Sequence, residues 1–415
     1  MHRVVLSFAL FFAIALNAIG AEKTIHLQVG PVETDRTNLP VKAVVSVPSA
    51  LANVSAVRLT VGDAQMWGQL TGASLLDAHM KGEVLNTGDV VRELHFVLPE
   101  VKAGKEVAVS ATISSDEPKP GETFQWEKEE ETHIDLTYAG KPVARYMKEG
   151  YDNSTAENRE RTYKVYHHVF APDGETLLTK GAGGRYTHHR GIYYGFSKTS
   201  YGDKLQKKAD IWHCKGNVHQ SQQGVISSEA GPVMARHRLA IAWIGDDNQM
   251  FAKEHRELTF YHTDDGLLVE FASKLQPMDG KLKLDGDPQH AGFQFRASND
   301  VNEKTAGQTY YIRPDGVDKP GSYKQGQHQP WNAMSFVLGG DRYTVCYLDH
   351  PENPKPAHYS ERNYGRFGSY FVAQTAGEET IDVNYRLWIQ PGEMDVAQVA
   401  QQAKNFVEPA TVTIK

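Results

Sequence analysis

The sequence has few cysteines, no excess of positive charge and no long hydrophobic run beyond its first residues. It contains 2 Cys in 415 residues, and 44 Lys and Arg stand against 51 Asp and Glu, a net charge of −7. The missing basic surplus argues against a protein that binds nucleic acid through its phosphates. Cys214 and Cys346 are far apart in the sequence. Because a chain of this length needs no disulfide for stability, we expect two separate thiols.

Beyond residue 20, the longest apolar run covers residues 239–244, which suits a buried strand and is too short to cross a bilayer. Residues 1–20 differ: a basic start at Arg3 precedes an apolar stretch over 4–15, and small residues stand at 18 and 20. This pattern predicts a signal peptide. An uncleaved anchor needs about 20 apolar residues, and Asn17 interrupts the run. We therefore expect a periplasmic or secreted protein without an integral membrane segment after cleavage.

Short runs rich in Val, Ile, Leu and Thr, separated by Pro, Gly, Asn and Asp, predict an all-β protein. We expect a small β-sandwich module over 21–115, an acidic linker over 116–131 and a large antiparallel β-sandwich domain over 132–415. The extended two-sheet sandwich of sugar-ring epimerases (mutarotases) is one form that the large domain can take. Apolar residues at helical spacing over 394–406 predict one C-terminal helix.

Several catalytic motifs are missing, including Gly-x-Ser-x-Gly, His-Glu-x-x-His and Cys-x-x-Cys. The glycine-rich residues 181–184 are not followed by a strand–helix unit, so they predict a turn and not a phosphate cradle. These absences disfavour a serine hydrolase, a zinc protease and a nucleotide-binding enzyme.

Histidine is plentiful, with 18 residues and two adjacent pairs, His167-His168 and His188-His189. His167 lies on the apolar face of a predicted strand, where a histidine is more often part of the core than a ligand contact. His188 and His189 precede Arg190 and an aromatic strand, which brings proton-transfer groups and an anion-binding group together. On a regular strand the two imidazoles would point to opposite sides. Both can face one pocket only if this segment bends.

Two other segments are rich in functional side chains. Asp210 precedes Trp212 by two residues, and Asp349-His350 leaves a strong strand for a proline-rich loop that leads to Arg362 and beyond. Polar loops beside a rigid sheet often hold functional sites. The alternative is a loop whose polar groups satisfy only its own turns.

Residues 134–407 resemble a bacterial family labelled "methane oxygenase PmoA", which is otherwise described as a domain of unknown function. The segments that carry the likeness are 166–174, His188-His189-Arg190-Gly191, 210–212, 254–256, 291–296, 349–354 and 362–365. Thr187 stands where the family usually has proline, and the N-terminal module lies outside the common core. The label implies a membrane protein with several spans, which the sequence beyond residue 20 does not contain. The resemblance implies a β-sandwich from bacteria that degrade polysaccharides outside the cell.

These observations predict an exported carbohydrate-active enzyme of lyase, hydrolase or epimerase type that uses histidine for proton transfer. Its partner would be a glycan or a sugar-derived small molecule. We expect Asp210 or Asp349 to orient the base or act as partner acid, Arg190 and Arg362 to hold a carboxylate or oxyanion, and aromatic rings to stack on the sugar. The catalytic candidates are His188, His189, Asp210, Asp349 and His350, and the substrate-binding candidates are Arg190, Tyr193, Trp212, Arg362, Tyr364 and His167.

Two alternatives remain at this point. A carbohydrate-binding protein without turnover would use the same arginines and aromatic rings. We expect no cofactor; the second alternative is a divalent metal held by His188, His189, Asp349 and His350, because clustered imidazoles and carboxylates suit such an ion.

Overall fold

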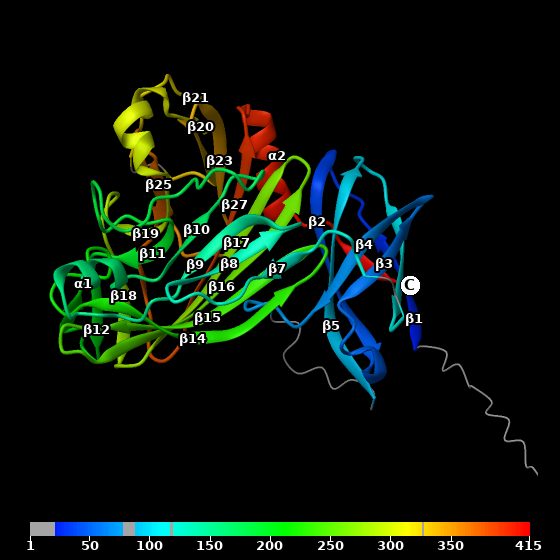
Figure 1. Ribbon diagram of the computed structural model, residues 1–415, viewed down its shortest axis with the longest axis horizontal. Helices are drawn as coiled ribbons and strands as arrows, with labels where there is room; N and C mark the ends of the chain where they lie inside the picture. The colour runs from blue at the N-terminus through cyan, green and yellow to red at the C-terminus, as the bar shows by residue number, and fades with distance from the viewer. Residues whose placement is uncertain (1–20, 78–87, 117–118, 326–327) are drawn as a thin grey trace, which may run out of the picture.

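The computed structural model describes residues 21–77, 88–116, 119–325 and 328–415 (Figure 1). The predicted signal peptide, residues 1–20, lies outside the described residues. Strands dominate the rest, as the sequence predicts.

The N-terminal module is one antiparallel sheet in the order β2-β5-β4-β3-β6-β1-β28. Alternate residues of its strands point to one face, where they form a separate core around Leu39, Leu59 and Phe96. Its strands are β1 (Glu22–Val29), β2 (Arg36–Pro48), β3 (Ala56–Val61), β4 (Ala64–Thr71), β5 (Asp89–Val101), β6 (Val107–Ser114) and β28 (Val412–Ile414). The last of these comes from the C-terminus and pairs with β1, so residues 412–414 belong to this sheet, whereas the sequence places them with the large domain.

The remaining chain forms the large two-sheet antiparallel sandwich that the sequence predicts (Figure 1). One sheet has eight strands in the order β24-β25-β19-β11-β10-β9-β8-β7, and the other has nine in the order β14-β15-β16-β17-β27-β23-β22-β20-β21. Their inner faces share one core, in which Phe271 of the nine-stranded sheet stacks on Phe293 of the eight-stranded sheet, with ring centres 4.3 Å apart. A smaller sheet in the order β13-β12-β18-β26 completes the fold.

The strands of the eight-stranded sheet are β7 (Phe124–Trp126), β8 (His133–Tyr138), β9 (Lys141–Met147), β10 (Tyr166–Val169), β11 (Ile192–Phe196), β19 (Ala291–Arg296), β24 (His358–Arg362) and β25 (Arg366–Tyr370). Those of the nine-stranded sheet are β14 (His219–Ala230), β15 (Met234–Ile244), β16 (Met250–Thr263), β17 (Gly266–Pro277), β20 (Tyr310–Arg313), β21 (Gly316–Val317), β22 (Trp331–Leu338), β23 (Asp341–Asp349) and β27 (Ile381–Pro391). The small sheet contains β12 (Thr199–Gly202), β13 (Lys207–Ala209), β18 (Lys281–Leu284) and β26 (Ala373–Gln374).

Strand β7 lies inside the segment that the sequence assigns to an acidic linker. Phe124 is buried against the sandwich, and the Trp126 indole donates a hydrogen bond to the Glu229 carbonyl at 3.1 Å. The acidic residues 127–131 that follow are exposed. The acidic run is thus solvated, whereas Phe124 anchors the segment to the sandwich.

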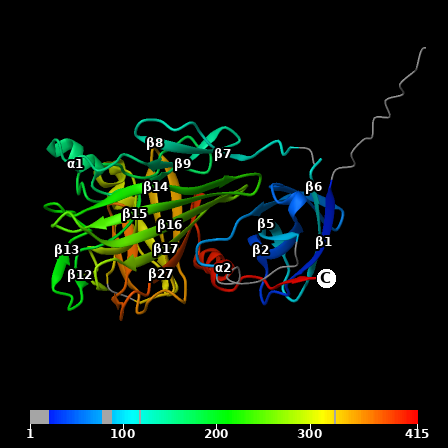
Figure 2. The same cartoon turned by 90° about the horizontal axis from the view of Figure 1, so that it is seen from below.

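The predicted C-terminal helix is α2 (Val396–Val407), which lies between the sandwich and the N-terminal sheet (Figure 2). Asp395 and Gln398 form a capping box at its start, and Val399, Ala403 and Phe406 form its buried face. A second, shorter helix, α1 (Ala156–Thr162), is not predicted, because its charged sequence has no apolar periodicity. Short helical turns also occur at η1 (Ser49–Leu51), η2 (Val301–Thr305) and η3 (Ala306–Gln308).

Cys214 and Cys346 are both buried and free, which confirms the expectation of two separate thiols. Among the described helices, none combines the length and the apolar character needed to cross a membrane.

Candidate functional site

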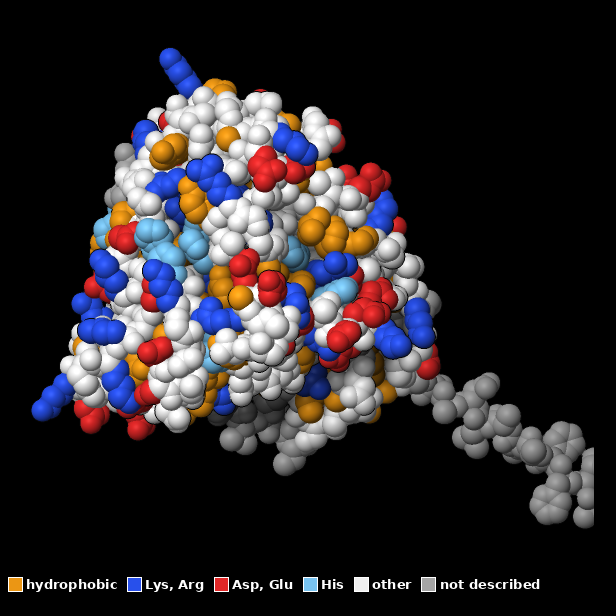
Figure 3. All heavy atoms as spheres, turned by 60° about the vertical axis from the view of Figure 1, so that its left-hand side comes forward, with side chains coloured by type: hydrophobic (Ala, Val, Ile, Leu, Met, Phe, Trp, Pro, Cys, Tyr) orange, Lys and Arg blue, Asp and Glu red, His pale blue; other side chains and the backbone are white. Residues whose placement is uncertain are grey.

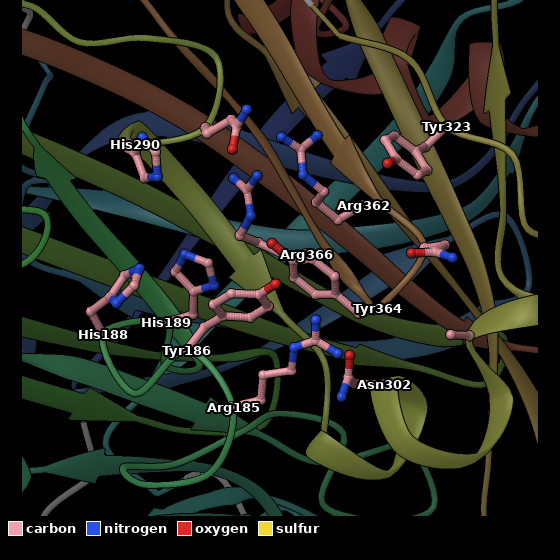
Figure 4. Close-up of a pocket in the computed structure, with 13 residues that line it drawn as sticks. Arg185, Tyr186, His188, His189, His290, Asn302, Tyr323, Arg362, Tyr364 and Arg366 are labelled. Atoms are coloured by element: carbon pink, nitrogen blue, oxygen red, sulfur yellow. The ribbon is translucent and has the colours of Figure 1, made fainter.

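A cavity of about 520 Å³ lies where the loops before β11 and β19 meet the β24–β25 hairpin (Figure 4). Its volume is within the range of small-molecule sites. On the face that Figure 3 shows, histidine side chains lie next to those of Lys and Arg. The charged, imidazole and phenol side chains that line the cavity are Arg185, Tyr186, His188, His189, His290, Tyr323, Arg362, Tyr364 and Arg366.

The segment that carries His188 and His189 is a turn and not a regular strand. The His189 amide donates to the Tyr186 carbonyl at 2.9 Å, and Tyr186 has a φ of 58°, which is rare for an aromatic residue. The two imidazole rings lie 4.3 Å apart, and both line the cavity. The bend that the sequence analysis required is therefore present.

Gly191 seats this turn against β10. It has a φ of 41°, and a Cβ at this position would lie 2.0 Å from the His167 carbonyl oxygen. Its amide donates to the Lys180 carbonyl at 2.8 Å. No other residue fits this approach without moving the turn that holds both cavity histidines.

Two buried lysines hold the same turn by its backbone. The Lys164 ammonium donates to the His188 carbonyl at 2.9 Å, and Lys180 donates to the His189 carbonyl at 3.3 Å. Burial lowers the pKa of Lys164 to about 8 and that of Lys180 to about 7. Two lysine side chains therefore fix the backbone beneath the histidine pair.

Both imidazoles are neutral at neutral pH. Burial, together with the nearby Lys164 ammonium, lowers the pKa of His188 to about 2. Burial and the Arg366 guanidinium hold the pKa of His189 well below its ordinary value. A neutral imidazole has a free nitrogen lone pair, so each ring is a proton acceptor.

Two further histidines adjoin His188, and each is bound to an aspartate three residues earlier. His213 Nδ1 lies 2.8 Å from Asp210, and His290 Nδ1 lies 2.9 Å from Asp287. The His213 ring is 4.6 Å from that of His188 and 4.9 Å from that of His290. Asp210 therefore reaches the cluster through His213. The sequence analysis missed both imidazoles, although the repeated Asp-x-x-His spacing was a usable signal.

Of the predicted stacking residues, only Tyr364 offers a face to the cavity, where its ring lies 5.0 Å from that of Tyr186. Tyr193 and Trp212 are fully buried. Trp212 packs behind His189, with ring centres 5.6 Å apart, so neither side chain is placed to stack on a sugar.

Arg190 and His167 also lie outside the cavity. The Arg190 guanidinium is fully buried and donates to the backbone carbonyls of Thr187, Arg161 and Glu160, which fastens the turn to α1. His167 is a core residue whose ring stacks on Tyr146 at 4.9 Å. The predicted anion-binding role of Arg190 is not supported by this placement, because its donors are already used.

Asp349 and His350 are equally separate from the cavity. Asp349 is buried, where it accepts from Asn353 at 2.7 Å and pairs with Lys355. The His350 ring packs against Phe406 of α2 at 5.2 Å. The structure therefore does not join them to His188 and His189 as the metal alternative requires. The described residues include no group of three or more His, Cys, Asp or Glu side chains that could hold a metal ion.

Thus His188, His189, Arg362 and Tyr364 are the predicted residues that the cavity brings together. Besides His290, the sequence analysis missed Arg185, Tyr186, Tyr323 and Arg366, which come from three separate segments of the chain. Arg366 directly follows the segment 362–365, which the sequence analysis did single out.

Two solved structures from Enterococcus faecalis are similar to the chain. Each match covers 94% of this chain with 9% sequence identity. One is a protein in the glycosyl hydrolase family 38, with a TM-score of 0.44, and the other is an alpha-mannosidase from strain V583, with a TM-score of 0.45. The matches cover 47% and 46% of those chains, so this chain spans about half the length of the proteins it matches.

No curated protein matches the sequence. One family model matches residues 133–404, which is most of the large sandwich, and its description does not repeat the methane oxygenase label. The chain belongs to this family, a family of unknown function (DUF6807).

Proposed function

We propose that the protein is a carbohydrate-active enzyme in which His188 removes a proton from a sugar bound in the cavity. The observation that carries the proposal is a neutral, half-buried imidazole that faces a cavity of ligand size, which the half-buried ring of Tyr364 also lines. A neutral imidazole within reach of a substrate proton is the usual general base in enzymes. Tyr364 supplies a flat face for the C–H side of a sugar ring.

The cavity favours a lyase or an epimerase over a hydrolase. Most glycoside hydrolases place two carboxyl groups on either side of the bond that they cleave. Among the described residues, no Asp or Glu lines this cavity. A β-eliminating lyase and an epimerase that inverts a carbon centre both begin with transfer of a proton from carbon to a base, here His188. In the lyase the C–O bond at the neighbouring carbon then breaks and the leaving oxygen takes up a proton, whereas in the epimerase a proton returns to the opposite face of the same carbon.

The low pKa of His188 makes it a weak base while the cavity is empty. Lys164, His213, His290 and Arg366 all contribute to this lowering, in addition to burial. A negatively charged group bound near Lys164 and Arg366 would raise the pKa of His188 toward its ordinary value. The base would therefore become active as the substrate binds.

The second candidate is a carbohydrate-binding protein without turnover. The observation that favours it is His189, whose two ring nitrogens are buried and have no hydrogen-bond partner among the described residues. A bound ligand could supply that partner without any reaction.

The test is a screen of purified protein against neutral and acidic polysaccharides. It would measure new reducing ends, ultraviolet absorbance of an unsaturated product, and sugar configuration by NMR. The variant His188→Ala should convert the glycan about 100-fold or more slowly than the wild type. The control is His255→Ala, on the strand β16 and outside the cavity, which should keep the rate.

Equal rates in the wild type and His188→Ala would refute the role of His188. Binding of a glycan by the wild type with no product after long incubation would support the carbohydrate-binding alternative.

A further inference from the structure

Three arginines lie directly opposite one another on adjacent strands at the edge of the cavity. Arg296 of β19 pairs in register with Arg366 of β25, which pairs in turn with Arg362 of β24. We call these three residues the arginine ladder. Residues directly opposite one another share a face of the sheet, and like charges in such pairs repel. The ladder is also buried, with exposures of 0%, 1% and 7% for Arg296, Arg366 and Arg362.

The ladder is bonded only to neutral groups. Arg296 donates to the carbonyls of Ala297, at 2.9 Å, and of Tyr364. Arg366 donates to Gln294 Oε1 at 3.0 Å and to Ser360 Oγ at 2.9 Å. Arg362 donates to the Glu361 carbonyl at 2.5 Å.

None of the three forms an ion pair with a described Asp or Glu. Elsewhere the same chain pairs buried arginines with carboxylates: Arg256 with Glu254 at 2.8 Å, Arg236 with Glu93 at 2.9 Å and Arg313 with Glu361 at 2.5 Å. Arg190 is also buried without a carboxylate, but each of its three guanidinium nitrogens donates to a backbone carbonyl. A buried arginine is rare unless it is paired. The ladder differs from these arginines because three unpaired guanidinium groups lie side by side, and two of them, Arg362 and Arg366, line the cavity.

Several donors of the ladder are unused. Arg296 Nε and Nη2 and Arg366 Nε are buried and have no hydrogen-bond partner among the described residues. Burial, with Arg366 adding to the effect, lowers the pKa of Arg296 to about 10. Arg185, which is exposed, adds a further guanidinium on the opposite side of the cavity (Figure 4). Positive charge thus converges on a space that contains no described acidic side chain.

We propose that the cavity binds an acidic sugar, and that Arg362 and Arg366 hold its anionic group, a carboxylate or a sulfate ester. This inference rests on the proposed function, because it names the substrate class of the same cavity. The planar fork of a guanidinium matches the paired oxygens of either anion. Arg296 lies behind Arg366 and acts as a positioning residue, while Arg185 contacts the anion or the sugar from the rim.

The two proposals also support each other chemically. An anion among the ladder arginines offsets the cationic field that contributes to the low pKa of His188. Where the anion is a carboxylate, neutralising it also makes the adjacent C–H bond easier to deprotonate, because the electron pair left behind delocalises into the carboxylate; this is the step assigned to His188.

The test is calorimetric binding of three matched probes: glucuronate, glucose 6-sulfate and glucose. We expect at least one anionic probe to bind about tenfold or more tightly than glucose, with an affinity that falls as salt rises. The variants Arg362→Gln and Arg185→Gln should each weaken that binding about tenfold or more. Because Arg185 is exposed, its variant keeps the test valid if Arg362→Gln fails to fold.

The matched control is Arg342→Gln, on β23 and outside the cavity, where Arg342 pairs with Glu393. It should bind all three probes as the wild type does. Preference for glucuronate would identify a carboxylate, and preference for glucose 6-sulfate a sulfate ester; either supports the inference. Equal binding of glucose and both anions, no binding of any probe, or anion binding unchanged in both cavity variants would overturn it.

The same measurements separate this inference from the proposed function. Binding of an acidic probe that depends on Arg185 or Arg362, with no conversion of any acidic glycan, supports the substrate class and refutes catalysis. Conversion of a neutral glycan, with no preference for the anionic probes, would support catalysis and refute the acidic substrate class.

Discussion

At the scale of single residues, Gly191 has the clearest structural role. We expect Gly191→Ala to lower the free energy of unfolding by about 2–4 kcal/mol, because the new Cβ would meet the His167 carbonyl and the backbone would be strained. The matched control is Gly183→Ala in the same loop, where φ is 80° and no atom lies within 4 Å of the added carbon. That change should cost only about 1 kcal/mol from backbone strain. Denaturant unfolding measures both values, and equal losses would contradict the steric role of Gly191.

The sequence predicts which residues line the cavity where residues that are close in the chain are also close in space. His188 and His189 are adjacent in the sequence, and both line the cavity. Arg362 and Tyr364 are two residues apart, and both line the same cavity. The arginine ladder was not readable, because the register that sets residue 296 beside 366 depends on long-range strand pairing.

Arg190 shows the opposite error. A guanidinium beside two histidines suggested an anion clamp, but three backbone carbonyls take up its donors. Two of these carbonyls belong to Glu160 and Arg161 of α1, a helix whose sequence has no apolar periodicity that would predict it. The missed helix thus led to the misplaced arginine.

At the scale of secondary structure, long amphipathic elements were predictable and short ones were not. The alternation of β1, β2, β3 and β6 and the helical spacing of α2 are visible because each buries several residues on one face. Strands β7 and β28 contain three residues each, too few to show a period. Each of these two strands forms because it pairs with the edge strand of a sheet, a contact that a short sequence does not reveal.

The ion pair between Glu93 and Arg236 connects the N-terminal sheet to the nine-stranded sheet of the sandwich. The Glu93 carboxylate of β5 is fully buried, 2.9 Å from Arg236 of β15 and 3.0 Å from His95. Although burial alone would raise it, the His95 hydrogen bond and the Arg236 charge hold the pKa of Glu93 far below its ordinary value.

We expect Glu93→Gln to lower the free energy of unfolding by about 3 kcal/mol, because Arg236 loses its shortest carboxylate contact. The double variant Glu93→Gln/Arg236→Gln should be more stable than the single one, since it removes a buried guanidinium that has lost its shortest carboxylate contact, while Glu257 keeps Arg238 as its partner. As a control, Glu100→Gln on the same strand affects an exposed pair with Lys102 and should change stability by no more than about 1 kcal/mol. Thermal unfolding checks all three, and a loss as small as that of the control would contradict the role of Glu93.

At the scale of the whole molecule, the many histidines make the fold sensitive to acid. Burial, with the cations around some of these side chains, lowers the pKa of His168 and His237 to about 4 and that of His188 to about 2, and holds His167 and His189 well below 6.5. In the unfolded chain each would take up a proton near pH 6.5. Below that pH the unfolded state binds more protons than the folded state, so stability is fully present above it and is lost as the pH falls.

The expected slope is about 1.4 kcal/mol per pH unit for each such histidine while the pH lies between its two pKa values. Urea unfolding measured from about pH 7 down to about pH 5 should therefore show a steep loss of stability, shared among several sites. His237 isolates one of them, because burial is the sole cause of its lowered pKa. His237→Gln, which cannot be protonated, should reduce the slope by about one such increment, whatever its effect on stability at neutral pH. A stability that stays level over this range, or a slope unchanged in the variant, would mean that the buried imidazoles gain protons without opposing the fold.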